Sequence, residues 1–140
     1  MNYSEVKKDL FIVDKSYHLA HCIASDLGMG AGIAVPMQKK FGIRNQIKNS
    51  GIPTHAPTCI KTGRVFNLIT KGKSSGKPTY ETLFMSLEDM KKQMLAEGIN
   101  KVAMPKIGCG LDRLSWGYVR EMIQDLFKDE DIEILVCVWP

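Results

Sequence analysis

A short apolar strand leads directly into a glycine-bearing loop in the stretch Lys101-Val102-Ala103-Met104-Pro105-Lys106-Ile107-Gly108-Cys109-Gly110-Leu111-Asp112-Arg113-Leu114. Pro105 to Leu114 is typical of a loop, and Ser115 is a favoured residue for the N-cap of a following helix. The helix shows apolar residues at helical spacing, namely Val119, Met122, Ile123, Leu126 and Phe127. A strand, a loop and a helix in this order form the repeating unit of an α/β domain.

The same alternation extends to both ends of the chain. Strands are expected at Tyr3 to Lys8, Tyr17 to Ile23 and Ile132 to Trp139, and a hairpin at Thr58 to Lys61 and Arg64 to Thr70 around Thr62-Gly63. Helices are expected at Ala31 to Phe41, with Pro36 in the first turn and Gly42 at the end, and from Pro78-Thr79 to Gly98, with the apolar face Leu83, Phe84, Leu87, Met90 and Met94. We therefore predict a three-layer α/β/α fold with a mixed central sheet, forming a single domain over residues 1–140.

The composition is that of an ordinary soluble protein. Hydrophobic residues make up 44% of the 140 residues and charged residues 24%, which excludes a disordered chain. The N-terminal segment mixes charges of both signs and no apolar run approaches membrane-spanning length, so we expect a cytoplasmic protein without membrane contact. Its four cysteines are widely spaced and lack histidines at ligand spacing, so we expect free thiols and no metal site. The net charge of +4 suits an anionic ligand but is too small for a nucleic-acid-binding arm.

Two glycine loops carry the functional signal. Gly28-Met29-Gly30-Ala31-Gly32-Ile33-Ala34 lies between a strand and a helix, and Gly108-Cys109-Gly110-Leu111-Asp112-Arg113 follows another strand. Glycines at such places let backbone N–H groups face a ligand, and the following helix N-terminus adds partial positive charge. Two such loops could hold a diphosphate between them, although each could also be a simple tight turn. The spacing of the first loop fits neither a dinucleotide fingerprint nor a Walker A loop.

At this point the sequence resembles a macrodomain, and most closely the terminal ADP-ribose protein glycohydrolase branch. The segments that carry the resemblance span nearly the whole chain in family order: Val6 to Phe11, Leu19 to Ile23, Met29 to Ala34, Leu68 to Lys71, Lys77 to Glu81 and Met104 to Leu114. His21-Cys22-Ile23 stands where many hydrolytic relatives carry an asparagine-rich stretch, so an asparagine-positioned water is not expected.

The resemblance implies removal of mono-ADP-ribose from glutamate or aspartate side chains, with O-acetyl-ADP-ribose as a related substrate and no cofactor. It assigns catalysis to Lys71 and Asp112, and to Asp9 a hydrogen bond from the adenine amino group. The remaining ligand-binding residues expected from it are Leu10, Met29, Gly30, Ala31, Gly32, Ile33, Thr70, Ile107, Gly108, Cys109, Gly110 and Leu111. ADP-ribose and ADP-ribosylated proteins are the expected partners, ADP-ribosylated DNA is an alternative substrate, and we expect a monomer.

The chemistry that these residues permit is a covalent mechanism. Lysine is a nucleophile only when uncharged, and burial at the end of an apolar strand or the nearby Lys73 and Lys77 would favour a neutral Lys71. As the resemblance implies, its amine would attack the distal ribose and form a Schiff base, which Asp112 would resolve by activating water. Each residue also has an ordinary explanation, since Lys71 could be a solvated lysine, Asp112 a turn residue and Asp9 a cap.

Two rival functions remain open at this stage. A non-catalytic ADP-ribose reader would need the glycine loops and Asp9 but would give no role to Lys71 or Asp112. RNA binding would suit the positive charge, but no basic run interleaved with aromatic residues is present. Trp139 could stack on adenine or simply pack against the sheet.

Overall fold

The computed structural model describes residues 1–109 and 112–138. Its strands are β1 (Asn2–Val6), β2 (His18–Ala24), β3 (Thr58–Thr62), β4 (Val65–Lys71), β5 (Lys101–Met104) and β6 (Glu133–Cys137). Its helices are α1 (Ala34–Phe41), α2 (Ile43–Ser50), α3 (Tyr80–Glu97) and α4 (Trp116–Phe127), with a 3-10 turn η1 (Leu10–Ile12) after β1. Among the described residues, no helix combines the length and apolarity needed to cross a membrane.

The strands form one mixed sheet in the order β1-β6-β5-β2-β4-β3. All neighbouring pairs are parallel except β3 and β4, which form the antiparallel hairpin that the sequence predicts. Because β5, β2 and β4 are parallel neighbours, their carboxyl ends and the loops that follow them lie along one edge of the sheet. Both glycine loops are brought together at that edge.

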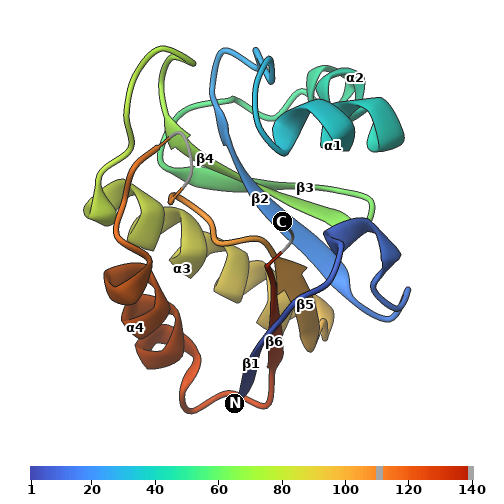
Figure 1. The fold of residues 1–140 in the computed structure, drawn as a ribbon. Helices are drawn as coiled ribbons and strands as arrows, with labels where there is room; N and C mark the ends of the chain where they lie inside the picture. The colour runs from blue at the N-terminus through green and yellow to red at the C-terminus, as the bar shows by residue number, and fades with distance from the viewer. Residues whose placement is uncertain (110–111, 139–140) are drawn as a thin grey trace.

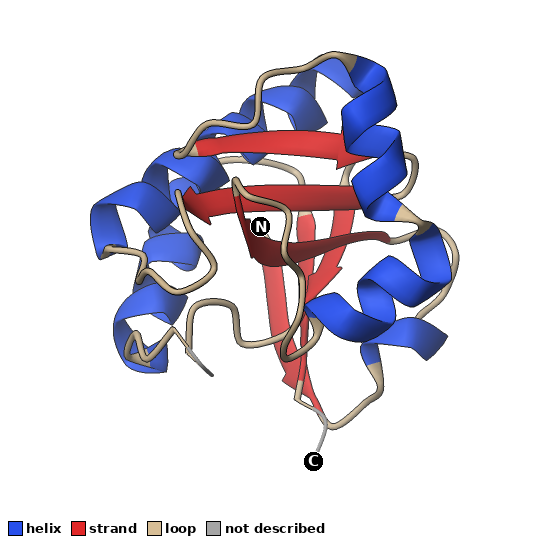
Figure 2. Cartoon of the chain, turned by 90° about the horizontal axis from the view of Figure 1, so that it is seen from above, coloured by secondary structure: helices blue, strands red, loops and turns tan. Residues whose placement is uncertain are grey.

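Helices cover both faces of the sheet, as Figures 1 and 2 show. One apolar core joins the sheet to α1 and α2, and the other joins it to α3 and α4. The strands supply both cores by alternation, since Leu19 and Ile23 of β2 face the first core and Ala20 between them faces the second. The predicted three-layer α/β/α arrangement is therefore confirmed.

Several predicted boundaries were wrong by a few residues. The first strand is Asn2–Val6, so it ends before Lys7, and the hairpin turn lies at Gly63 and Arg64. The helix predicted from Ala31 begins only at Ala34, because Ala31 to Ile33 complete the first glycine loop; Pro36 still lies in the first turn. The last strand ends at Cys137, and Trp139 lies outside the described residues.

Other side chains near the helix ends also differ from expectation. Phe84 was predicted on the buried face of α3 but is 36% exposed. Ser115 occupies the N-cap of α4 without a capping side-chain hydrogen bond, whereas Thr79 caps α3 through a reciprocal pair with Thr82. The four cysteines are free thiols, as expected.

Helix α2 was not predicted at all. Its sequence is mostly polar, and only Ile43 and Ile47 are buried. Gly42, with a φ of 56°, ends α1 and begins α2 in one residue, so the chain turns sharply where the sequence indicates only a helix end.

A buried polar pair lies inside the sheet beneath the cleft described below. The imidazole of His21 in β2 lies 2.6 Å from Asn67 Oδ1 in β4. Asn67 Nδ2 donates to the Ile60 carbonyl and to Thr62 Oγ1, so its Oδ1 is left to accept, and His21 Nε2 carries the hydrogen. His21 Nδ1 is buried and has no hydrogen-bond partner in the described structure. Complete burial lowers the pKa of His21 to about 4.

We expect this histidine to make the fold sensitive to mild acid. An unfolded histidine has a pKa of about 6.5, so between pH 6.5 and 4 the unfolded chain binds a proton that the folded chain does not. Stability conferred by the neutral ring is therefore complete above pH 6.5 and is lost as the pH falls. The free energy of unfolding, measured in urea, should drop by about 2 kcal/mol between pH 7 and pH 5.

Glutamate and aspartate residues should not obscure this effect. Glu5, whose pKa the Arg120 guanidinium lowers to about 2, titrates in the unfolded chain near 4.5 and contributes only at more acid pH. His21→Gln should flatten the slope between pH 7 and 5. An equally steep slope in that variant would assign the sensitivity to another group.

Candidate active site

A cleft of about 530 Å³ opens at the carboxyl ends of β2, β4 and β5. Its walls are the two glycine loops and the loop that follows β4. Nine of the residues predicted to form the site line it: Met29, Gly30, Ala31, Gly32, Ile33, Lys71, Ile107, Gly108 and Asp112. Residues from three separate parts of the chain thus share one cavity because parallel strands end at the same edge.

The first glycine loop has an unusual backbone. Leu27 and Met29 have φ values of 57° and 47°, in the left-handed region that non-glycine residues seldom adopt, and Gly32 has a φ of 62°. Each non-glycine residue in this conformation costs of order 1–3 kcal/mol, so surrounding contacts must hold it in place. Such backbone is typical of functional loops, where it directs amide groups toward a ligand.

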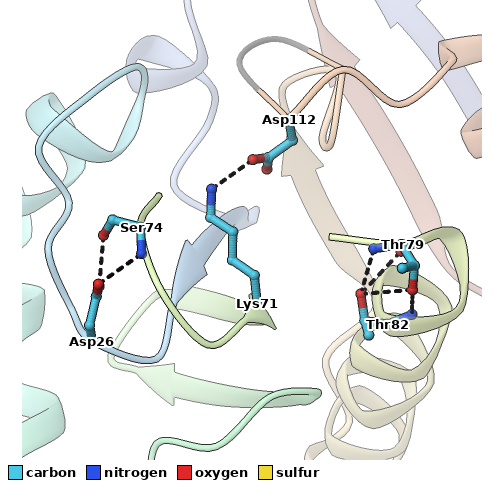
Figure 3. A network of polar contacts seen from close by, with 6 residues as sticks. All are labelled: Asp26, Lys71, Ser74, Thr79, Thr82 and Asp112. Carbon is cyan, nitrogen blue, oxygen red and sulfur yellow. Dashed lines mark hydrogen bonds and ion pairs between the residues drawn. The ribbon is translucent and has the colours of Figure 1, made fainter. Parts of the chain in front are cut away.

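A second set of contacts fastens this loop to the loop after β4 (Figure 3). The Asp26 carboxylate accepts hydrogen bonds from the backbone N–H and the hydroxyl of Ser74, both at 2.7 Å, and from the Gly28 N–H at 2.9 Å. The Ser74 contacts, with a smaller contribution from Gly28, hold the pKa of the Asp26 carboxyl below its usual value. A Cβ on Gly28 would lie 2.4 Å from Ser74 Oγ, so only glycine allows this close approach.

The second glycine loop is fixed by its contact with α3. Gly108 has a φ of 75°, and a Cβ there would lie 3.0 Å from Leu114 Cδ1 and 3.3 Å from Leu83 Cδ2. The Gly108 carbonyl accepts a hydrogen bond from the Leu114 N–H, which closes the loop around Asp112. Arg113, directly after Asp112, also has a left-handed φ of 63°. Asp112 itself lines the cleft.

Lys71 and Asp112 meet inside the cleft, although 41 residues separate them in the sequence. Lys71 Nζ donates to Asp112 Oδ1 at 2.8 Å, and Figure 3 shows the two side chains pointing toward each other, Lys71 from the end of β4 and Asp112 from the loop after β5. Each side chain is only 15% exposed. The partner of the lysine is therefore an anion that can accept its proton. Of the two neighbouring lysines that the sequence suggests as its partners, Lys73 and Lys77, only Lys77 lines the cleft.

Other predicted residues lie outside the lining of the cleft. Asp9 follows β1 at the same edge of the sheet and caps η1, where its Oδ1 accepts the Phe11 N–H at 2.9 Å. The side chain of Leu10 belongs to the core, Thr70 is buried, and Cys109 is partly buried against the core on the α3 and α4 side of the sheet. Gly110 and Leu111 lie outside the described residues. A ligand-binding role for these six residues stays a prediction.

Sequence reasoning missed several residues that line the cleft. Ser74, Ser75 and Lys77 come from the loop after β4, and Cys22, Ile23, Ala24, Ala34 and Pro105 flank the glycine loops. The loop after β4 directly follows the strand that ends in Lys71, and this place in the sequence could have indicated that its residues lie beside the cleft. No group of three or more metal-ligating side chains gathers anywhere in the described part of the chain.

Comparison with known proteins decides the family. The chain is 49% identical over 136 residues to the human ADP-ribose glycohydrolase OARD1 and 47% identical to the bovine protein; each match covers 94% of this chain and 88% of the relative. The chain belongs to the macrodomain family of ADP-ribose glycohydrolases. Membership confirms the resemblance drawn from the sequence and the expected enzyme class, a hydrolase. No protein-family model matches the chain.

Solved structures agree on the macrodomain fold. The macrodomain of Thermus aquaticus DarG superposes with a TM-score of 0.82 at 19% identity, covering 96% of this chain and 97% of that one. The Mycobacterium tuberculosis DarG macrodomain gives 0.80 at 19% identity, covering 99% and 97%. Thermosipho africanus DarTG in complex with ADP-ribose gives 0.78 at 18% identity, covering 99% of this chain and 42% of that one. At these identities the likeness concerns the fold.

Proposed function

We propose that this macrodomain removes mono-ADP-ribose from glutamate and aspartate side chains, and deacetylates O-acetyl-ADP-ribose, through a covalent intermediate on Lys71 that Asp112 resolves. The observation that carries the proposal is the 2.8 Å contact between Lys71 Nζ and Asp112 Oδ1 inside the cleft between the glycine loops. The ADP-ribose named with the DarTG structure supports ADP-ribose as the ligand of this cleft.

The first step needs an amine and a leaving group. Asp112 Oδ1 takes a proton from the Lys71 ammonium, and the neutral Nζ attacks the anomeric carbon of the distal ribose. The new C–N bond forms as the C–O bond to the acyl group breaks, and the substrate carboxylate leaves with the bonding electrons. Opening of the ribose ring then gives a protonated Schiff base on Lys71.

The second step returns the enzyme to its starting state. Asp112 first releases to solvent the proton that it took from Lys71. Its carboxylate then removes a proton from water as the water oxygen adds to the Schiff-base carbon, and this proton passes to Lys71 Nζ as the C–N bond breaks. Free ADP-ribose leaves the cleft, and the sum is one water consumed for each ester bond broken. Because residues of both glycine loops line the cleft, the same contacts would hold the diphosphate through both steps.

A panel of substrates tests the proposal. We expect release of ADP-ribose from a glutamate-linked ADP-ribosylated peptide and from O-acetyl-ADP-ribose, because each expels a carboxylate. A serine-linked peptide is the matched control, since its alkoxide is a much poorer leaving group, and it should react at least about 100-fold more slowly.

Two other outcomes would redirect the assignment. Release from DNA carrying an ADP-ribosylated base, with no reaction of either ester, would make the chain a DNA glycohydrolase. Tight binding of ADP-ribose without release from any substrate would make it a reader.

A further inference from the structure

Arg44 of α2 reaches back to the first glycine loop. Its Nε donates to the Leu27 carbonyl at 2.9 Å, and its Nη2 donates to the Gly28 carbonyl at 2.7 Å. A guanidinium presents its N–H groups in a fixed planar fork, so one side chain fixes two consecutive peptide groups. Arg44 does not line the cleft itself, and its contacts lie behind the loop.

The two carbonyl contacts also orient the amide groups of the loop. In a trans peptide the C=O and the N–H point in opposite directions. The N–H paired with the Leu27 carbonyl belongs to Gly28 and is taken by Asp26 Oδ1 at 2.9 Å. The N–H paired with the Gly28 carbonyl belongs to Met29, so it points to the side opposite Arg44, and Met29 begins the run of loop residues that line the cleft.

The same contacts explain how the strained backbone persists. Leu27 and Met29, both left-handed, stand on either side of the residue whose carbonyl Arg44 holds. Arg44 is itself held in place, because its backbone N–H donates to the Gln38 side chain at 2.8 Å and Gly42 fixes the angle between α1 and α2. Helix α2, which is mostly polar and buries only Ile43 and Ile47, thus places the Arg44 guanidinium against the first glycine loop.

We propose that Arg44 is a positioning residue that holds the Leu27–Met29 turn in the conformation that binds the diphosphate. The proposal rests on the proposed function, because it takes the cleft as the ADP-ribose site. Arg44 touches neither Lys71 nor Asp112 in the described structure, so its loss weakens binding and leaves the chemical step intact. This division between KM and kcat distinguishes positioning from general structural support.

The test compares three variants with the wild-type chain. Arg44→Met keeps the length and removes the donors, Arg44→Lys keeps one donor, and Lys48→Met removes an exposed cation from the same helix as a matched control. Calorimetry gives the Kd for ADP-ribose, O-acetyl-ADP-ribose hydrolysis gives KM and kcat, and thermal unfolding reports stability. We expect Arg44→Met to raise Kd and KM about 10-fold with kcat within about 2-fold, Arg44→Lys to raise them about 3-fold, and Lys48→Met to change neither.

Chemical rescue of ADP-ribose affinity distinguishes positioning of the loop from general support of the fold, because only a missing guanidinium contact can be restored by an added guanidinium. Added ethylguanidinium at millimolar concentration should recover part of the ADP-ribose affinity of Arg44→Ala, and ethylammonium should not. If Arg44→Met fails to fold, Arg44→Lys and the rescue decide the matter. Two results would overturn the role of Arg44 and leave the proposed function standing. One is wild-type ADP-ribose affinity in Arg44→Lys together with no rescue of Arg44→Ala. The other is a loss of ADP-ribose affinity in Lys48→Met as large as that in Arg44→Met. A wild-type chain that does not bind ADP-ribose overturns the proposed function as well.

Discussion

Lys71→Arg should lower kcat for ester-linked substrates by about 10³-fold or more while leaving the Kd for ADP-ribose within about 3-fold of the wild type. Arginine keeps the positive charge and can still donate to Asp112, so the ion pair that lines the cleft survives. Its guanidinium stays protonated at any working pH and cannot attack the anomeric carbon. The substitution therefore separates the charge of Lys71 from its nucleophilicity.

The measurement is single-turnover release of ADP-ribose from a glutamate-linked peptide, with calorimetry for binding. Lys73→Arg is the matched control, because Lys73 is exposed, lies two residues further along the chain in the loop after β4 and does not line the cleft. Retention of more than a tenth of the wild-type rate by Lys71→Arg would reduce Lys71 to an electrostatic role. Loss of ADP-ribose binding would show instead that the side chain shapes the cleft.

The resemblance assigns Lys71 and Asp112 to one site, and the fold supplies a physical reason why the two side chains meet. Each residue stands at or soon after the carboxyl end of a parallel strand, and such ends converge whatever the distance along the chain. The same rule accounts for the two glycine loops on opposite walls of one cleft. Residues tied to strand ends are therefore the part of this site that sequence reasoning reaches.

What the sequence does not predict depends on contacts between loops. Leu27 and Met29 carry no local signal for a left-handed backbone, because Arg44 and Asp26 impose it from elsewhere in the chain. Ser74 looks like any polar loop residue until the fold brings it to Asp26. Helix α2 escapes prediction since two buried isoleucines are too few to establish a period.

The role of Asp112 after the covalent step predicts an intermediate that can be trapped. In Asp112→Ala, Lys71 loses its anionic partner, and solvent replaces the carboxylate as the acceptor of the lysine proton. Attack on the ester can then proceed, but no side chain is left to activate water against the Schiff base. Turnover should fall by about 10²–10⁴-fold, and the protein should accumulate a mass increase of one ADP-ribosyl group.

Intact mass spectrometry after brief exposure to the glutamate-linked peptide, with borohydride to reduce the imine, checks this expectation. Peptide mapping should place the label on Lys71 rather than on Lys73 or Lys77. Because the nucleophile is then absent, the double variant Lys71→Arg, Asp112→Ala should gain no mass under the same conditions. An unmodified Asp112→Ala protein that has nevertheless lost turnover would mean that water attacks the ribose directly, with Asp112 as its base and Lys71 as the charge that orients the carboxylate.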